Sequence, residues 1–269
     1  MGKDINNDNT FMIRFRSSVI LMAFTIASIV LGGYVLPAVL FIISLIGMME
    51  LYRAVGVHKT VGAAIGYIAC TLWYMLLIIT EFGLLDKAVD RTQGKAAKLL
   101  TIVGGEPAAD FFIIVMMLLV ILLAVYVIEF PRYNTEQLAV LFLGFFYVAV
   151  LLSFVFRIRV LPGGQYSVWL LFVGSWGADT AAYLVGRKWG RHKIVPVLSP
   201  KKSLEGFIGG ILGAGLIGVI YALIFKSHLI EAGIGSPILT FGVIGTVSAV
   251  VSIIGDLAAS AINRSCADI

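Results

Sequence analysis

The sequence predicts an all-α fold, a polytopic integral membrane bundle of about eight transmembrane helices. Only 13% of the 269 residues are charged, against about 25% in a typical soluble domain. The mean hydropathy is +1.01, and the apolar runs approach or exceed the roughly 20 residues that a helix needs to cross a bilayer. The expected spans are, approximately, residues 17–32, 34–52, 62–80, 110–129, 137–156, 165–185, 204–225 and 238–259.

The first two expected spans are short, and Gly32–Gly33 divides them. The glycine pair marks either a tight connection or a kink in one bent segment across residues 17–52, and we favour two short helices. Residues 17–32 do not resemble a cleaved signal peptide, because no convincing small-x-small site precedes the next apolar run.

Basic residues are unevenly distributed over the loops, which predicts the orientation of the chain. With the N-terminus in the cytoplasm, thirteen of the twenty Lys and Arg residues lie in cytoplasmic segments, six of them in 186–203. We therefore expect a multi-pass protein of the cell (plasma) membrane whose N-terminus and 186–203 loop are cytoplasmic. The net charge of +5 then needs no nucleic acid partner, because basic loops lie beside the anionic headgroups of membrane lipids.

The chain is expected to form one integral membrane domain with two parts. Residues 1–164 supply N-terminal membrane helices, and residues 165–269 are more polar. Cys70 and Cys266 have no CxxC companion, so they suggest neither a disulfide nor a metal site.

The segment "GAGLIG" (213–218) matches the dinucleotide-binding pattern G-x-G-x-x-G. That pattern has meaning only between a strand and the start of a helix, whereas here it lies inside an apolar span. The glycines at 206, 209, 210, 213 and 218 instead predict a helix face that packs closely against its neighbours.

Three polar clusters interrupt the second part of the chain. The first, "GSWGADTAAYLVGRKWG", places Asp179 about two helical turns before Gly186, with Ser175 and Tyr183 on the same helix face. An acid at this depth in a span is costly and usually functional. The alternative is a structural acid paired with an arginine of a neighbouring helix.

The second cluster is "SPKKSLEG". Ser199 suits a helix N-cap and Pro200 the first helical position, which puts Lys201 and Lys202 in the first turn; Ser203 is a rival cap one turn later. In either case free backbone N–H groups and two ammonium groups converge, as in a phosphate site. The alternative is that the lysines are ordinary basic residues of a cytoplasmic loop.

The third cluster is "GDLAASAINR" (255–264), in which Asp256, Ser260 and Asn263 share one face at the end of an apolar helix. A carboxylate there suits Mg²⁺, which prefers oxygen ligands and shares its coordination with substrate phosphates. The alternative for this acid is a cap or a salt bridge.

The three clusters together, in this order and spacing, resemble the phosphatidate cytidylyltransferases (CDP-diglyceride synthases). The resemblance rests on "WGADTAAYLVGRKWGRHKI", "SPKKSLEGFIGG" and "GDLAASAINR". It is close over about residues 165–264 and general before them. It implies a membrane nucleotidyltransferase of phospholipid biosynthesis that makes CDP-diacylglycerol and pyrophosphate from CTP and phosphatidate with Mg²⁺. The oligomeric state stays open, a homodimer included.

The resemblance also implies which residues act. It places catalysis in residues 165–269, with two lysines that hold the triphosphate and two acids that hold Mg²⁺. The lipid phosphate is itself the nucleophile, so no side-chain nucleophile is required. The catalytic positions are Lys201, Lys202, Asp179 and Asp256, the last two also as metal ligands; the substrate-binding positions are Ser199, Ser203, Glu205, Gly206, Ser260 and Arg264.

The sequence departs from the family pattern in two places. Asn263 stands where the signature usually has a lysine, and the chain stops at "SCADI" before the signature's later acids. We therefore expect a chain cut short within the signature, with weak turnover of CTP or none.

Two other functions are compatible with parts of the sequence. An acid inside a span and glycine-rich helices also occur in ion-coupled transporters, although the polar clusters here gather toward one face of the membrane. A CTP-dependent lipid kinase, such as a dolichol kinase, would differ in its products, which are lipid phosphate and CDP.

Overall fold

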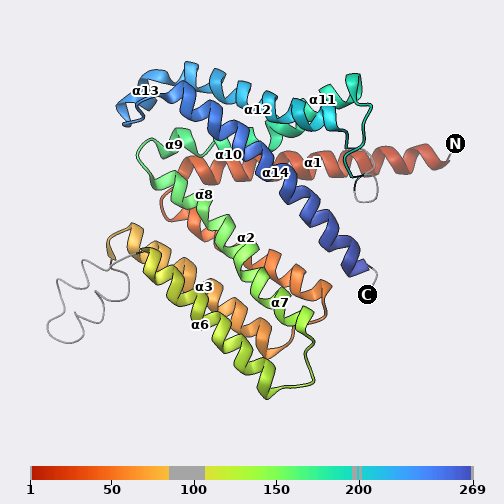
Figure 1. The fold of residues 1–269 in the computed structure, drawn as a ribbon, viewed down its shortest axis with the longest axis vertical. Helices are drawn as coiled ribbons and strands as arrows, with labels where there is room; N and C mark the ends of the chain where they lie inside the picture. Colours follow the sequence, from red (N-terminus) through yellow and green to blue (C-terminus); the bar gives the residue numbers. More distant parts are fainter. Residues whose placement is uncertain (1, 85–106, 196–198, 200–201, 268–269) are drawn as a thin grey trace. The chain divides into compact units, whose positions relative to one another are not determined.

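The computed structural model describes residues 2–84, 107–195, 199 and 202–267 (Figure 1). The side chains described are those of 16–84, 111–195, 199 and 202–261. The chain divides into two compact units, Met1–Phe156 and Arg157–Ile269. Both units are helical in the described residues, where β pairing is limited to one isolated bridge. The predicted all-α class is confirmed.

Seven described helices are long and apolar enough to cross a membrane. The expected first span is present as the apolar part of α1, Arg16–Leu31, which is shorter than the seven. The polytopic bundle is therefore confirmed. The seven are Val35–Ala54, Val61–Glu81, Phe111–Ile128, Thr135–Val160, Gly164–Trp189, Leu204–Ile224 and Pro237–Ala261.

The first unit begins with two separate helices, as favoured from the sequence. Helix α1 (Gly2–Leu31) ends just before the glycine pair, and α2 (Val35–Ala54) begins just after it. Gly32 and Gly33 have φ values of 57° and 48°, in the left-handed region that glycine adopts without a steric penalty. The pair is therefore a tight connection and not a kink in one helix.

The remaining helices of the first unit enclose a polar contact network in an apolar core. They are α3 (Val61–Glu81), α6 (Pro107–Ile128), α7 (Thr135–Gly144), the π-helix η1 (Phe145–Val150) and α8 (Leu151–Val160), which continues into the second unit. The buried Tyr52 hydroxyl donates to the Leu141 carbonyl at 2.7 Å. Gly66 and Gly144 leave room for its side chain, because a Cβ at Gly66 would lie 2.5 Å from the hydroxyl oxygen and one at Gly144 would lie 2.5 Å from the ring.

The second unit contains two long antiparallel helices and several shorter ones. Short helices α9 (Gly164–Ser167) and α10 (Leu170–Phe172) lead through the π-helix η2 (Val173–Gly177) into α11 (Ala178–Trp189). Helix α12 (Leu204–Ile224) then lies beside both α11 and α14 (Pro237–Ala267), and α13 (Lys226–Glu231) connects α12 to α14 (Figure 1).

Glycines bring α12 close to both of its neighbours. A Cβ at Gly210 would lie 2.9 Å from the Ala178 carbonyl oxygen of α11, and one at Gly218 would meet the Phe241 carbonyl of α14 at 2.5 Å. Gly213, within "GAGLIG", lies against the methyl group of Ala181. The segment is thus a close-packing face between helices, as predicted. Through its glycines α12 packs against the first residues of both α11 and α14.

Candidate functional site

The predicted cytoplasmic loop returns on itself between α11 and α12. The Leu204 N–H donates to the His192 carbonyl at 2.8 Å, and the Ile194 N–H donates to the Lys202 carbonyl at 3.4 Å. Lys193 and Ser203 form an isolated antiparallel bridge between these bonds. The two ends of the loop are therefore held side by side, and we call this paired segment (residues 190–194 and 202–205) the loop neck.

Ser203, and not Ser199, caps α12. Its side-chain oxygen accepts a hydrogen bond from the Gly206 N–H at 3.2 Å, and its backbone is extended, with φ −112° and ψ 154°. Ser199 instead lies in a turn, where its carbonyl accepts from the Lys202 N–H. The placement of Lys202 in the first helical turn was therefore wrong: it precedes the cap, where its side chain is free to turn away from the positive helix end. Lys201 and Pro200 lie outside the described residues.

Glu205 connects the two segments of the loop neck, because it lies in 202–205 and binds residues of 190–194. Its carboxylate accepts from the Arg191 N–H at 3.0 Å and from the His192 N–H at 3.2 Å. The Nδ1 atom of His192 lies 2.7 Å from the same carboxylate. The resemblance assigned Glu205 to substrate binding, and the structure gives its carboxylate backbone partners in the protein. Glu205 therefore determines where the loop leaves α11.

A second long-range contact joins the loop to α14. The Lys202 ammonium lies 2.5 Å from Oδ2 of Asp256. Lys202 has 28% of its side chain exposed and Asp256 has 62%, so water and solutes reach the pair. The Ser260 hydroxyl donates to the Asp256 carbonyl at 2.8 Å, one helical turn earlier on α14. The side chain of Asn263 lies outside the described residues.

A cavity of about 430 Å³ opens beside this ion pair. Its polar lining comes from α11, the loop neck and the first turn of α12, and Ile253 and Leu257 of α14 contribute an apolar wall. A volume of this size is typical of small-molecule sites. The polar lining residues are Asp179, Tyr183, Arg187, Lys202, Ser203 and Gly206.

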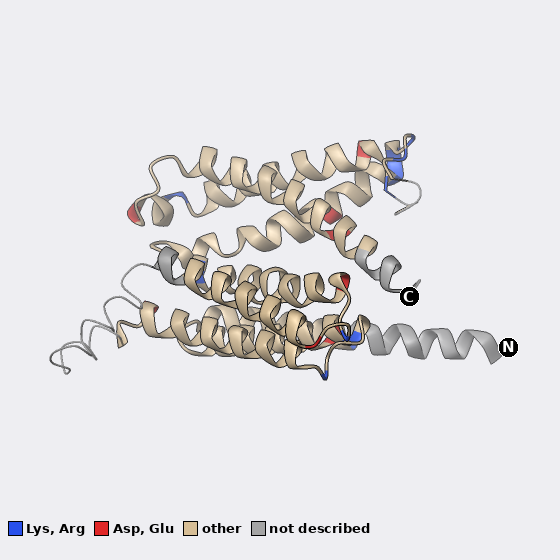
Figure 2. Ribbon diagram, turned by 60° about the horizontal axis from the view of Figure 1, so that its bottom comes forward, with Lys and Arg blue, Asp and Glu red and all other residues tan. Residues whose placement is uncertain are grey.

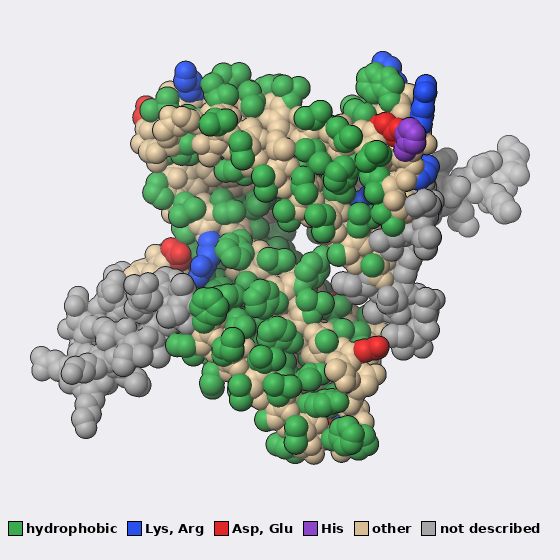
Figure 3. Space-filling model, viewed as in Figure 1, with side chains coloured by type: hydrophobic (Ala, Val, Ile, Leu, Met, Phe, Trp, Pro, Cys, Tyr) green, Lys and Arg blue, Asp and Glu red, His purple; other side chains and the backbone are tan. Residues whose placement is uncertain are grey.

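Charge is concentrated at this end of the second unit. Figure 2 shows basic residues gathered where α11 ends and α12 begins, with an acid beside them. Figure 3 shows a histidine against an acid at the same edge, where His192 pairs with Glu205. Several cations near one cavity favour an anionic ligand.

The structure brings together some of the sequence-predicted residues and separates others. The predicted residues that line the cavity are Asp179, Lys202, Ser203 and Gly206. Asp256 forms an ion pair with Lys202 at the edge of this lining. Ser199, Glu205 and Ser260 are absent from the described lining. The side chain of Arg264 lies outside the described residues.

Sequence reasoning missed Arg187 as a site residue and named Tyr183 only as a neighbour of Asp179. Asp179, Tyr183 and Arg187 are spaced by four residues, which places them along one helix face, and all three line the cavity. That spacing is the signal that could have found them. Phe207 of α12 also lines the cavity, but its sequence context is that of any apolar helix.

The acids of the site suit a hard cation that completes its shell with water and substrate. Asp179 and Asp256 are both exposed, and in the described residues no group of three or more His, Cys, Asp or Glu side chains is close enough to hold a metal alone. Mg²⁺ usually takes one or two carboxylates and fills the remaining positions with water and phosphate oxygens. Either carboxylate could therefore supply one ligand to Mg²⁺, with water and phosphate oxygens completing its shell.

Comparisons with known proteins identify the family of the chain. The chain is 31% identical over 107 residues to the phosphatidate cytidylyltransferase of Staphylococcus epidermidis, which covers 40% of each chain. It is 30% identical over 126 residues to the enzyme of the same name from Staphylococcus aureus, which covers 46% of this chain and 48% of the relative. The chain thus spans less than half the length of these curated relatives. A sequence model of the cytidylyltransferase family matches residues 12–267, and because this match covers nearly the whole chain, the chain belongs to that family.

Proposed function

We propose that this chain is a phosphatidate cytidylyltransferase, which makes CDP-diacylglycerol and pyrophosphate from CTP and phosphatidate. The observation that carries the proposal is the cavity that Lys202, Asp179 and the capped start of α12 line, with Asp256 paired to Lys202 beside it. Triphosphate recognition needs cations and backbone N–H groups. The names of the relatives support the choice of phosphatidate as the lipid substrate.

The reaction is a displacement at phosphorus. A phosphate oxygen of phosphatidate forms a bond to the α-phosphorus of CTP, and the bond from that phosphorus to the bridging oxygen breaks, so that pyrophosphate leaves with the electron pair. Negative charge grows on the departing pyrophosphate. We assign the neutralisation of this charge to Lys202 and its sequence neighbour Lys201.

The Lys202–Asp256 pair holds the proposed phosphate-binding ammonium next to the proposed metal-binding carboxylate. In the ion pair each charge neutralises the other. A triphosphate oxygen can replace the Asp256 carboxylate at the Lys202 ammonium, and Asp256 and Asp179 would then be the residues that hold Mg²⁺. Mg²⁺, when bound, supplies charge neutralisation at the phosphates. The cofactor is thus part of the proposal, and Asp179 and Asp256 are its proposed ligands.

We further propose that the loop neck faces the cytoplasm of a cell whose plasma membrane holds the protein. The basic residues of 186–203 support this orientation through the positive-inside rule. CTP then reaches the cavity from water, and the diacyl lipid enters between the helices. The reaction involves no nucleic acid, and a homodimer remains a prediction.

The position of the label in the products tests the reaction. Membranes that contain the protein are incubated with Mg²⁺, phosphatidate and CTP labelled at either the α- or the γ-phosphate. We expect the α-label to enter the lipid fraction and the γ-label to leave as pyrophosphate. Because turnover is expected to be weak, the incubation is long. Transfer of the γ-label to a lipid acceptor would identify a lipid kinase instead, and a lipid fraction without either label would contradict the proposed activity.

A further inference from the structure

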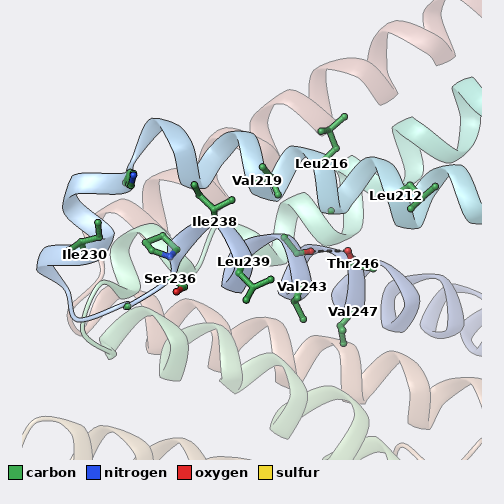
Figure 4. Close-up of a pocket in the computed structure, with 15 residues that line it drawn as sticks. Leu212, Leu216, Val219, Ile230, Ser236, Ile238, Leu239, Val243, Thr246 and Val247 are labelled. Carbon is green, nitrogen blue, oxygen red and sulfur yellow. Dashed lines mark hydrogen bonds between the residues drawn. The ribbon is translucent and has the colours of Figure 1, made fainter.

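A second and larger hollow lies between α12 and α14 at the end remote from Lys202. Its volume is about 860 Å³, and it forms an open groove (Figure 4). Leu212, Leu216 and Val219 of α12 lie along one side, and Leu239, Val243 and Val247 of α14 lie along the other. It shares no lining residue with the cavity at the loop neck.

The length of α12 places the groove at the opposite membrane surface. The helix has 21 residues, which at about 1.5 Å per residue gives roughly 30 Å, the thickness of the hydrocarbon core. Lys202 precedes one end of the helix and Lys226 follows the other. The groove therefore runs from the membrane interior to the headgroup level of the leaflet away from the loop neck.

The groove is mostly apolar, and its hydroxyl-bearing lining residues are Ser236 and Thr246. Leu216, Leu239 and Val243 are 61%, 69% and 53% exposed, so they face whatever surrounds the protein. Lys226 is the charged residue among the lining residues that the structure describes. In the described part of the chain no carboxylate pairs with it, and nearby Glu231 is within 3.8 Å of His228 instead.

The small residues of the groove are already used within the unit. A Cβ at Gly215 would meet Thr246 at 2.5 Å, and one at Gly242 would meet Val219 at 2.8 Å. Helix association between chains in lipid depends on small residues that allow close approach. Because these glycines serve the contact between α12 and α14, the exposed surface that remains consists of long aliphatic side chains, which suit a slender acyl chain better than a second helix.

We propose that this groove binds a phospholipid with an anionic headgroup, with one acyl chain along α12 and α14 and the headgroup phosphate at Lys226. Bulk lipid offers an acyl chain the same apolar environment as the groove does, so shape and charge decide the selectivity. Lys226 supplies the charge. The proposal concerns the leaflet opposite the cavity and does not depend on the proposed reaction.

Photolabelling in vesicles of phosphatidylcholine tests the site. A small fraction of either phosphatidylglycerol or phosphatidylcholine carries a diazirine in one acyl chain, and labelled peptides are identified by mass spectrometry. We expect phosphatidylglycerol to label peptides that contain Leu216 or Val243 about fivefold more than phosphatidylcholine does, as expected for one lysine near an anionic headgroup. Lys226→Gln should remove this preference, whereas Lys59→Gln should preserve it.

A bulky substitution tests the groove itself. Val243→Trp fills the hollow and should lower labelling by both lipids, whereas Leu223→Trp, an exposed position of α12 that does not line the groove, should not. Equal labelling by the two lipids in the unsubstituted protein would overturn the headgroup assignment. Absence of lipid label, together with crosslinking of two copies through Val243→Cys, would show that a second copy occupies the groove.

Discussion

Lys202 and Asp256 form an ion pair across 54 residues of sequence, with 2.5 Å between the ammonium nitrogen and Oδ2. The pair connects the loop neck to α14 beside a cavity that Asp179 also lines. Exposed ion pairs contribute at most about 1 kcal/mol to stability. The Lys202–Asp256 pair is therefore expected to matter more for ligand binding than for the stability of the fold. The first two predictions test Lys202 and Asp256 in turn.

Replacement of Lys202 tests the phosphate-binding role. Lys202→Met keeps the aliphatic stem and removes the charge, so CTP affinity should fall by about 10- to 100-fold, as expected for the loss of charge-assisted hydrogen bonds. Equilibrium binding of labelled CTP to purified protein measures this. Lys59→Met, in the connection between α2 and α3, is the matched control. Unchanged CTP affinity in Lys202→Met would leave the lysine as an ordinary basic loop residue.

Replacement of Asp256 separates metal binding from ion pairing. Asp256→Asn should raise the Mg²⁺ concentration for half-maximal activity by about tenfold or more, and Asp179→Asn should act in the same direction. Glu129→Gln, which removes an acid paired with Arg132 in the first unit, is the control. If Asp256→Asn alters only CTP affinity measured without Mg²⁺, then Asp256 serves Lys202 and is no metal ligand.

The identity of the helix cap can be measured directly. Ser203→Ala removes the acceptor for the Gly206 N–H and should lower the free energy of unfolding by about 1 kcal/mol. Ser199→Ala should change it by less than about 0.5 kcal/mol, because Ser199 lies in a turn and caps no helix. Unfolding of both variants in mixed micelles gives the comparison. The reverse order of the two effects would restore Ser199 as the cap.

Glu205 is expected to act through the position of the loop. Glu205→Gln introduces an amide N–H₂ opposite the backbone donors of Arg191 and His192, so the loop neck should loosen. Trypsin should then cleave after Lys193 faster than in the unsubstituted protein, and KM for CTP should rise more than kcat falls. Glu231→Gln in α13 is the control. A fall in kcat with an unchanged cleavage rate would indicate direct contact with substrate instead.

The orientation of α12 can be tested with single cysteines at its two ends. Lys193→Cys should react with a membrane-impermeant maleimide only from the cytoplasmic side, and Lys226→Cys only from the opposite side. The reason is that α12 is long enough to cross the hydrocarbon core. Labelling is compared in intact cells and in inverted vesicles. Labelling of both cysteines from one side would exclude a transmembrane α12.

Hydropathy alone was sufficient to predict the membrane bundle. A helix that crosses a bilayer must satisfy its backbone hydrogen bonds internally and present apolar side chains to lipid, so its sequence carries the signal locally. The separation of α1 from α2 was predictable for a similar reason, because the positive φ values at Gly32 and Gly33 suit glycine alone. The packing role of Gly213 followed from its place inside an apolar span.

Site chemistry was only partly predictable, because it depends on contacts between distant residues. The sequence identified Asp179 as a candidate because an acid inside a membrane span is energetically costly. It identified Lys202 and Asp256 from the polar residues around them in one short segment each. It could not choose between Ser199 and Ser203, because both have the side chain that a cap needs, and the antiparallel pairing of the loop neck decides between them.

The sequence by itself determined which segments are helical, which face of α12 carries small residues, and where polar groups interrupt the apolar chain. Tertiary structure alone decided that Lys202 pairs with Asp256 and that Glu205 binds the backbone at Arg191 and His192. The physical reason is the distance along the chain over which each effect acts. Hydropathy and backbone preference act within a few residues, whereas an ion pair between two loops or helix ends exists only once close packing at Gly210 and Gly218 has fixed α12 against both of its neighbours.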